Sequence, residues 1–171
     1  MKKILFVDAC VRKESRTKQL AEHLLSQLEG TIAEVNLERE NLRPLDGNTL
    51  LRRDHLIEKK AYSDPMFRNA RLLAEADTVV IAAPFWDLSF PASLKTYCEH
   101  TMVSGLTFDY EGDDPVGCCK AAELYYITTA GGPIFLRSRV LDTSGIWQEY
   151  SGVSQHRFCL KRKAWICLGL M

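Results

Sequence analysis

The chain has 171 residues, of which 46% are hydrophobic and 26% are charged, as in ordinary soluble globular proteins. This length fits one domain with a substantial core, so we treat residues 1–171 as a single domain. The 22 basic residues are balanced by 22 acidic ones, and a net charge of zero gives no reason to expect nucleic acid or a membrane surface as a partner.

The amino terminus does not resemble an export signal. Its apolar run is short and ends at Asp8, so it is far too short for a signal peptide or a membrane span. We therefore expect a cytoplasmic location. None of the cysteines forms a C-x-x-C pair and the histidines show no ligand spacing, so we expect no metal site.

The hydrophobic pattern predicts strands that alternate with helices. A strand over Lys3–Ala9 precedes a helix over Ser15–Leu28, and a second strand is expected over Ile32–Leu37. The polar segment Glu38–Tyr62 contains Asp46-Gly47, a pair typical of turns. We expect this segment to be a long excursion with one set of helical turns.

The alternation continues in the second half of the pattern. Asp64-Pro65 is typical of a helix start, and this helix is expected to continue to about Ala76. A buried strand over Thr78–Ala83 and a helix over about Pro91–Met102 follow, and a further strand is expected over Ala121–Thr129. This order indicates an α/β fold with a parallel, doubly wound sheet.

The loop after the first strand is rich in groups that bind phosphate. A helix is expected to open near Ser15, and its free N–H groups and dipole favour an anion. Thr17 adds a hydroxyl group, and Arg12 and Arg16 add positive charge. The alternative is an ordinary helix cap by Ser15 beside solvated arginines, and this motif alone leaves both interpretations open.

Two further loops follow predicted strands and favour a flat, apolar ligand. Pro84 ends the buried strand, and the aromatic loop up to Phe90 then lies where open α/β sheets bind ligands. Gly131 and Gly132 follow the later strand and permit a close approach of the backbone. A hydrophobic plug and an ordinary turn are the respective alternatives. Together, the three loops describe a site for flavin mononucleotide (FMN).

The sequence resembles the flavodoxin-like NAD(P)H-dependent oxidoreductases, a family that includes quinone reductases and FMN-dependent azoreductases. Four segments carry the resemblance: Ala9–Thr17, Ala83–Tyr97, Gly105–Tyr110 and Thr128–Gly132. It covers the chain from its start to about Ile134. The resemblance implies a flavodoxin-like, three-layer fold around the doubly wound parallel sheet.

The resemblance also assigns FMN to the three loops. The phosphate would be held by Ser15, Arg16 and Thr17, with Arg12 adding charge. The isoalloxazine ring and the ribityl chain would be lined by Pro84, Phe85, Trp86, Asp87 and Leu88. The other side of the ring would be closed by Thr129, Ala130, Gly131 and Gly132. Ala9 departs from the family, because relatives often carry a hydroxyl group there.

The reaction implied by the resemblance takes place on the flavin, so no catalytic side chain is expected. Hydride would pass from NAD(P)H through FMN to a quinone, an azo compound or a similar flat acceptor. Backbone N–H groups near the ring would stabilise negative charge on the reduced flavin. Relatives are usually homodimers, and Trp86 and Phe90 are the exposed aromatic residues expected at the subunit boundary.

Two other functions fit parts of the sequence. Cys10-x5-Arg16 resembles the phosphate loop of low-molecular-weight tyrosine phosphatases, in which a low-pKa cysteine attacks phosphorus and Asp114 would act as general acid. However, this loop lacks glycine, places Glu14 near the expected dianion and leaves the other two loops unexplained. The second alternative is a protein that carries FMN without turnover.

The tail departs from the family from about residue 137. The neighbouring reading frame permits GFGYIRDLARIFG over Arg139–Gly152, which is helix-like, and AEGLD within Lys161–Cys167. Both resemble the family's missing end, where a helix precedes a strand and an Ala-Glu-Gly-Leu segment. We therefore hypothesise a frameshift near residue 137, and a divergent tail is the alternative. Under this hypothesis the last helix and strand are altered or missing, which would weaken FMN retention and dimerisation.

Overall fold

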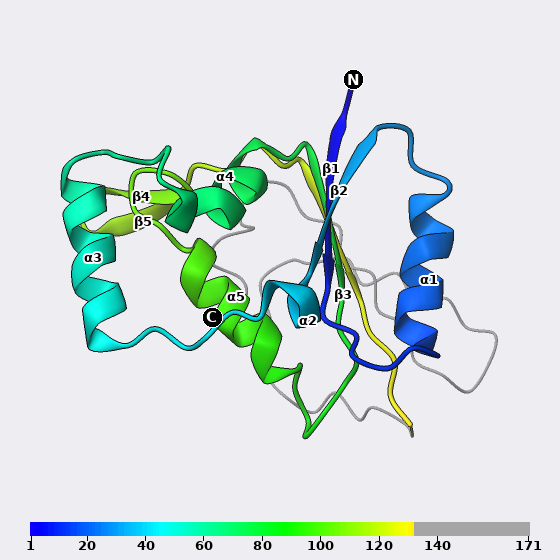
Figure 1. Cartoon of the computed structure of the whole chain (residues 1–171). Coiled ribbons are helices and arrows are strands. Elements are labelled where there is room, and N and C mark those ends of the chain that lie inside the picture. The colour runs from blue at the N-terminus through cyan, green and yellow to red at the C-terminus, as the bar shows by residue number, and fades with distance from the viewer. Residues whose placement is uncertain (132–171) are drawn as a thin grey trace.

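The computed structural model describes residues 1–131 of the chain (Figure 1). Its main sheet has four parallel strands in the order β2-β1-β3-β6. Their bounds are Lys3–Asp8 for β1, Thr31–Asn36 for β2, Thr78–Ala82 for β3 and Glu123–Ile127 for β6. Because β1 lies between β2 and β3, the chain winds in both directions from its first strand. This confirms the predicted α/β class with a doubly wound parallel sheet.

Helices cover both faces of this sheet, which confirms the predicted three layers (Figure 1). On one face lies α1 (Arg16–Leu25), and on the other lie α4 (Arg68–Glu75) and α5 (Ala92–Thr101). The helix predicted over Ser15–Leu28 therefore ends three residues early. Within residues 1–131, no helix is long and apolar enough to cross a bilayer.

Alternate residues of β1 pack into the two layers. Ile4 and Phe6 belong to a buried cluster with Leu25 of α1, whereas Leu5 belongs to a cluster with Leu94 of α5. All residues of β3 are buried, as the continuous apolar run of this strand predicts. Because each buried aliphatic side chain stabilises the fold by roughly 1.5–3 kcal/mol, the sheet is a firm base for the loops at its edge.

The excursion between β2 and α4 contains more helix than the sequence predicts. It holds α2 (Leu37–Glu40) and α3 (Gly47–Glu58), so the expectation of a single set of turns was wrong. Asp46 is the N-cap of α3, because its Oδ1 accepts a hydrogen bond from the N–H of Thr49 at 2.7 Å. Aspartate before glycine suits a helix cap as well as a turn, which explains the error.

The helix start predicted at Asp64-Pro65 is confirmed, although its first turn is a 3-10 helix, η1 (Pro65–Phe67). The Oδ1 of Asp64 accepts a hydrogen bond from the N–H of Met66 at 2.8 Å. The chain then continues into α4, for which Ala76 is the C-cap, as expected.

One element was not predicted at all. An antiparallel hairpin, β4 (Phe108–Glu111) and β5 (Asp114–Gly117), lies between α5 and β6 and forms a separate two-stranded sheet. It lies on the same side of the main sheet as α3 and α5 (Figure 1). The tail to which the frameshift hypothesis applies lies outside the described residues.

Candidate functional site

Hydrogen bonds join the three predicted loops at one edge of the sheet. The hydroxyl groups of Thr17 and Thr129, both buried, lie 2.6 Å apart and connect the start of α1 to the loop after β6. The N–H of Phe85 donates to the carbonyl oxygen of Thr129 at 3.0 Å and connects the loop after β3 to the same residue. Thr129 therefore contacts both other loops.

The first loop ends in a capped helix whose first N–H groups face outward along the helix axis. Ser15 is the N-cap, and its Oγ accepts a hydrogen bond from the N–H of Lys18 at 3.3 Å. The N–H groups of Arg16 and Thr17 precede the first intrahelical hydrogen bonds, so they have no acceptor within the helix. The two interpretations of this loop are therefore compatible: Ser15 caps the helix, and two N–H groups remain for an anion.

The side chains of the first loop divide into buried hydroxyl groups and exposed cations. Ser15 and Thr17 are buried, whereas Arg12 and Arg16 are exposed. An exposed guanidinium stays hydrated while the site is empty, and it can pair with a phosphate when the ligand binds. The hydroxyl of Thr17 already contacts Thr129, so its most direct contribution to this loop is to hold it against the third.

The second loop turns sharply just beyond β3. Trp86 and Ser89 exchange two backbone hydrogen bonds, of 3.0 Å and 2.8 Å, across Asp87 and Leu88. The φ angles of these two residues are 47° and 62°, which together define a type I′ turn. A leucine in this left-handed conformation costs roughly 1–2 kcal/mol. Backbone strain of this kind is commonly kept at functional sites.

The same turn holds apolar side chains in solvent. Leu88 is 89% exposed and Trp86 is 40% exposed. Phe90, by contrast, packs against the core cluster, so the expectation that both aromatic residues are exposed holds for Trp86 alone. The alternative that this loop is a hydrophobic plug therefore fits Phe90, but it does not fit Trp86 and Leu88.

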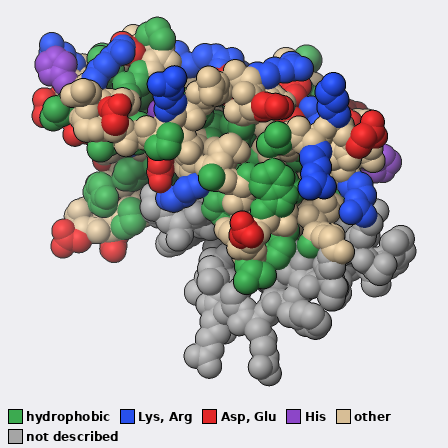
Figure 2. All heavy atoms as spheres, turned by 60° about the horizontal axis from the view of Figure 1, so that its bottom comes forward, with side chains coloured by type: hydrophobic (Ala, Val, Ile, Leu, Met, Phe, Trp, Pro, Cys, Tyr) green, Lys and Arg blue, Asp and Glu red, His purple; other side chains and the backbone are tan. Residues whose placement is uncertain are grey.

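Figure 2 views the molecule from the edge at which these loops meet. Hydrophobic side chains gather in the middle of this face, and Lys and Arg side chains lie beside them. The exposed large hydrophobic residues include Val11 of the first loop together with Trp86 and Leu88 of the second. An apolar surface with cations beside it suits a ligand with a flat ring at one end and an anion at the other.

The third loop becomes progressively more exposed along the chain. Thr129 is buried, Ala130 is half-buried and Gly131 is exposed. A Cβ atom added to Gly131 would meet no atom of residues 1–131 within 4 Å, so the backbone there borders open space among the described residues. That space is what a close approach of a ligand to the backbone requires. Gly132 lies outside the described residues.

The environment of Cys10 opposes the phosphatase alternative. Its thiol is buried and donates to the carbonyl oxygen of Ala82, with 3.6 Å between sulfur and oxygen. Burial raises the pKa of the Cys10 thiol to about 12, and the nearby Asp8 carboxylate acts in the same direction. A nucleophilic cysteine needs a lowered pKa. The proposed general acid, Asp114, lies in β5, away from the start of α1 (Figure 1).

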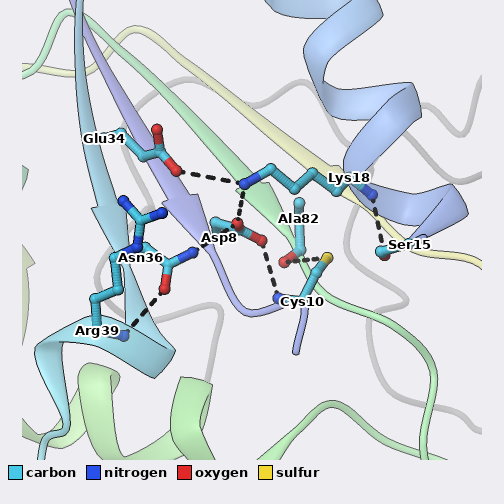
Figure 3. A network of polar contacts seen from close by, with 8 residues as sticks. All are labelled: Asp8, Cys10, Ser15, Lys18, Glu34, Asn36, Arg39 and Ala82. Carbon is cyan, nitrogen blue, oxygen red and sulfur yellow. Dashed lines mark hydrogen bonds and ion pairs between the residues drawn. The ribbon is translucent and has the colours of Figure 1, made fainter. Parts of the chain in front are cut away.

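A buried carboxylate beside the first loop was not anticipated from the sequence. The Oδ2 of Asp8 lies 2.7 Å from the Nζ of Lys18 and 3.0 Å from the Nδ2 of Asn36 (Figure 3). Its Oδ1 accepts a hydrogen bond from the N–H of Cys10 at 2.9 Å. The available signal was an aspartate that closes an apolar strand, where a buried position requires a charged partner.

The chain matches a known protein family over most of its length. Residues 2–144 match the sequence model of a family described as having a flavodoxin-like fold. The chain belongs to this family. The match extends about ten residues beyond Ile134, where the resemblance in the sequence was expected to end. It stops before Gly145, so the last part of the tail remains outside it.

Curated members of the flavodoxin-like family resemble the chain over most of its length. An FMN-dependent NADH:quinone oxidoreductase from Coprothermobacter proteolyticus is 34% identical over 142 residues, which cover 77% of this chain and 69% of the relative. One from Clostridium perfringens is 32% identical over 139 residues, with 77% and 70% covered. The crystal structure of an azoreductase from Bacillus anthracis str. Sterne matches with a TM-score of 0.66 at 27% identity, covering 78% of this chain and 71% of that one.

Proposed function

We propose that the chain is an FMN-dependent NAD(P)H oxidoreductase that reduces a quinone, an azo compound or a similar flat acceptor. The observation that carries this proposal is the junction of the three loops at Thr129, which contacts both Thr17 and Phe85. This junction brings the start of α1, which would bind an anion, and the apolar, exposed turn to one sheet edge. Curated relatives that match most of the chain are named for the same chemistry.

The residues present fit FMN at both of its ends. The phosphate would be held by the N–H groups at the start of α1 and by the side chains of Ser15, Arg16, Thr17 and Arg12. The ring would lie against the exposed turn, lined by Pro84, Phe85, Trp86, Asp87 and Leu88. The loop from Thr129 through Ala130 to Gly131 and Gly132 would close the other side. When bound, FMN supplies the transfer of hydride from NAD(P)H to the acceptor.

The protein itself supplies binding, orientation and electrostatics. The turn hydrogen bonds use the N–H groups of Trp86 and Ser89. In a type I′ turn the N–H groups of the two central residues, Asp87 and Leu88, take no part in these bonds. They are therefore the donors that we assign to polar atoms of the ring, where they would favour negative charge on it.

The proposal includes a homodimer in the cytoplasm. Trp86 and Leu88 expose apolar surface at the sheet edge, and a second copy would cover what the ring leaves uncovered. Size-exclusion chromatography with light scattering tests this part, because a monomer at micromolar concentration with FMN bound would contradict it.

The visible spectrum of the purified full chain with added FMN tests the central proposal. We expect bound flavin to lose its yellow absorption under anaerobic NADH or NADPH and to regain it when a quinone is added. Bound flavin that neither nucleotide reduces would support the carrier without turnover. A colourless protein that hydrolyses a phenyl phosphate through Cys10 would support the phosphatase instead.

A charge variant locates the phosphate end of the site. Arg16→Met should weaken FMN binding about tenfold and leave riboflavin binding unchanged, because riboflavin lacks the phosphate. Arg43→Met removes the same charge from another exposed position and is the matched control. Equal losses for FMN and riboflavin would remove Arg16 from the phosphate site.

We also propose that the chain is a single domain. In addition, we propose that the codons from about residue 137 are translated in a shifted reading frame. The nucleotide sequence decides this point directly. Codons that cannot spell GFGYIRDLARIFG over Arg139–Gly152 in the neighbouring frame end the proposal. If the codons do spell it, restoring the frame should tighten FMN binding and dimerisation.

A further inference from the structure

A buried ion pair lies where the chain leaves β1 and enters α1. The side chain of Asp8 is fully buried, whereas that of Lys18 keeps 28% of its surface exposed. Their charged atoms lie 2.7 Å apart. Figure 3 shows Lys18 reaching from the first turn of α1 back to the end of β1, with Ser15 at the start of the same turn.

This pair closes the first loop at both of its ends. The Oδ1 of Asp8 fixes the N–H of Cys10 at 2.9 Å as the loop begins, and Oδ2 holds Lys18 just after the loop ends. Asn36, at the end of β2, donates to the same Oδ2 at 3.0 Å. Contacts with this one carboxylate therefore help to fix the first loop and the first turn of α1.

The charge of this carboxylate conflicts with the proposed ligand. An unpaired negative charge beside the start of α1 would repel a phosphate, and in a protein interior such repulsion is weakly screened. Lys18 balances it: the hydrogen bond to Asp8 and the charge of Asp8 raise the pKa of the Lys18 ammonium group, which therefore stays protonated. The Oε1 of Glu34 lies 3.5 Å from the Nζ of Lys18. Lys18 therefore faces a second negative charge besides that of Asp8.

We propose that Lys18 and Asp8 are positioning residues for the phosphate of the cofactor. Asp8 orients the first loop and the start of α1, and Lys18 cancels the negative charge that this arrangement brings to the site. This inference rests on the proposed function, because it assumes that FMN is the ligand. It assigns a role to two residues that are not among those proposed to hold the phosphate.

The inference predicts a charge effect that a purely structural role does not produce. Lys18→Met leaves the Asp8 carboxylate unbalanced, so it should weaken FMN binding about tenfold and riboflavin binding by less than about twofold. The double variant Asp8→Asn/Lys18→Met removes both charges and should recover most of the lost FMN affinity. Lys18→Arg keeps the charge and should retain the parent's ratio of FMN to riboflavin affinity.

The experiment measures dissociation constants of FMN and riboflavin for the full chain and these variants, by quenching of flavin fluorescence. Lys13→Met, which removes a charge from an exposed position of the same loop, is the matched control and should change the ratio by less than about twofold. Should Lys18→Met lose its cooperative melting transition, Lys18→Arg and the double variant decide, because both keep the parent's net charge summed over Asp8, Lys18 and Glu34.

Three outcomes overturn the inference. Equal losses of FMN and riboflavin affinity in Lys18→Met would reduce the pair to a structural role. A double variant as weak toward FMN as Lys18→Met would show that the unbalanced carboxylate is not the cause. A parent chain that binds neither flavin would overturn the proposed function, and the inference with it. If the parent binds both flavins, the variants test the role of Lys18 and Asp8 independently of the proposed function.

Discussion

The two ends of the candidate site are organised by opposite means. At the start of α1, buried polar side chains hold the backbone through hydrogen bonds and an ion pair, as Thr17 and Asp8 show. At the turn after β3, the backbone of Asp87 and Leu88 is held in a strained conformation and the side chains point into solvent. The anion end is therefore built before a ligand arrives, whereas the ring end keeps its apolar surface open.

This difference leads to different responses to mutation. Changes at the polar end should cost both stability and ligand binding, because the contacts that orient the site also hold the fold together. Changes at the strained turn should separate the two properties, since relieving strain stabilises the fold while removing apolar surface weakens binding. Variants at Thr17 and at Leu88 test this separation.

The largest expected effect concerns the reactivity of Cys10. Because burial raises the pKa of its thiol to about 12, from an ordinary value of 9.0, alkylation by iodoacetamide at pH 8 should be at least about 100-fold slower than at the exposed Cys118. Timed labelling followed by peptide mass mapping measures both rates in one sample. Rapid labelling of Cys10 in the folded protein would revive the phosphatase alternative.

Removal of the hydroxyl that joins two loops should have the next largest effect. Thr17→Val leaves the buried Thr129 hydroxyl without this partner and should lower the free energy of unfolding by about 1–3 kcal/mol. FMN affinity should fall as well, because the third loop loses its anchor. Urea denaturation with and without FMN measures both effects.

The control for Thr17→Val is Thr31→Val, which makes the same change at an exposed position of β2. It should alter the free energy of unfolding by less than about 0.5 kcal/mol. The double variant Thr17→Val/Thr129→Val should recover part of the stability lost in the single variant, because no hydroxyl is then left unpaired. A stable Thr17→Val protein with normal FMN affinity would contradict the proposed junction.

The smallest expected effect has the opposite sign. Leu88→Asn should raise the free energy of unfolding by about 1 kcal/mol, because asparagine tolerates the left-handed conformation better than leucine. Flavin affinity should fall in the same variant, since apolar surface at the ring end is lost. Thermal melting of the flavin-free protein and fluorescence titration measure the two effects separately.

A matched control for Leu88→Asn is Leu51→Asn, at an exposed leucine within α3. There the backbone is helical, so asparagine should lower stability by a few tenths of a kcal/mol rather than raise it. If both substitutions destabilise the protein equally, the strain that we assign to Leu88 is not relieved by asparagine.

Much of the scaffold was predictable because its central strands, β1 and β3, are buried on both faces. The continuous apolar runs of β1 and β3 predict the positions of these strands within one residue at each end. The β4–β5 hairpin was missed because Asp109, Glu111 and Asp114 interrupt any apolar period there. Asp46 was misread because aspartate before glycine serves both turns and helix caps.

The meeting of the three loops was predictable from topology alone, since parallel strands end at the same edge. What the sequence could not show is how the loops are joined. The Thr17–Thr129 contact and the Asp8–Lys18 pair depend on tertiary packing, and neither follows from local propensity. The left-handed conformation of Leu88 was hidden because leucine is among the residues least expected there.

The position of Thr129 also has a consequence for the order in which the protein is assembled. Its contact with Thr17 joins residues 112 positions apart in the chain, so it closes only after all of the intervening sequence has been synthesised. A growing chain shorter than this has the start of α1 but not the junction. The capacity to retain a flavin therefore arises late in folding, and flavin binding reports that the sheet edge is complete.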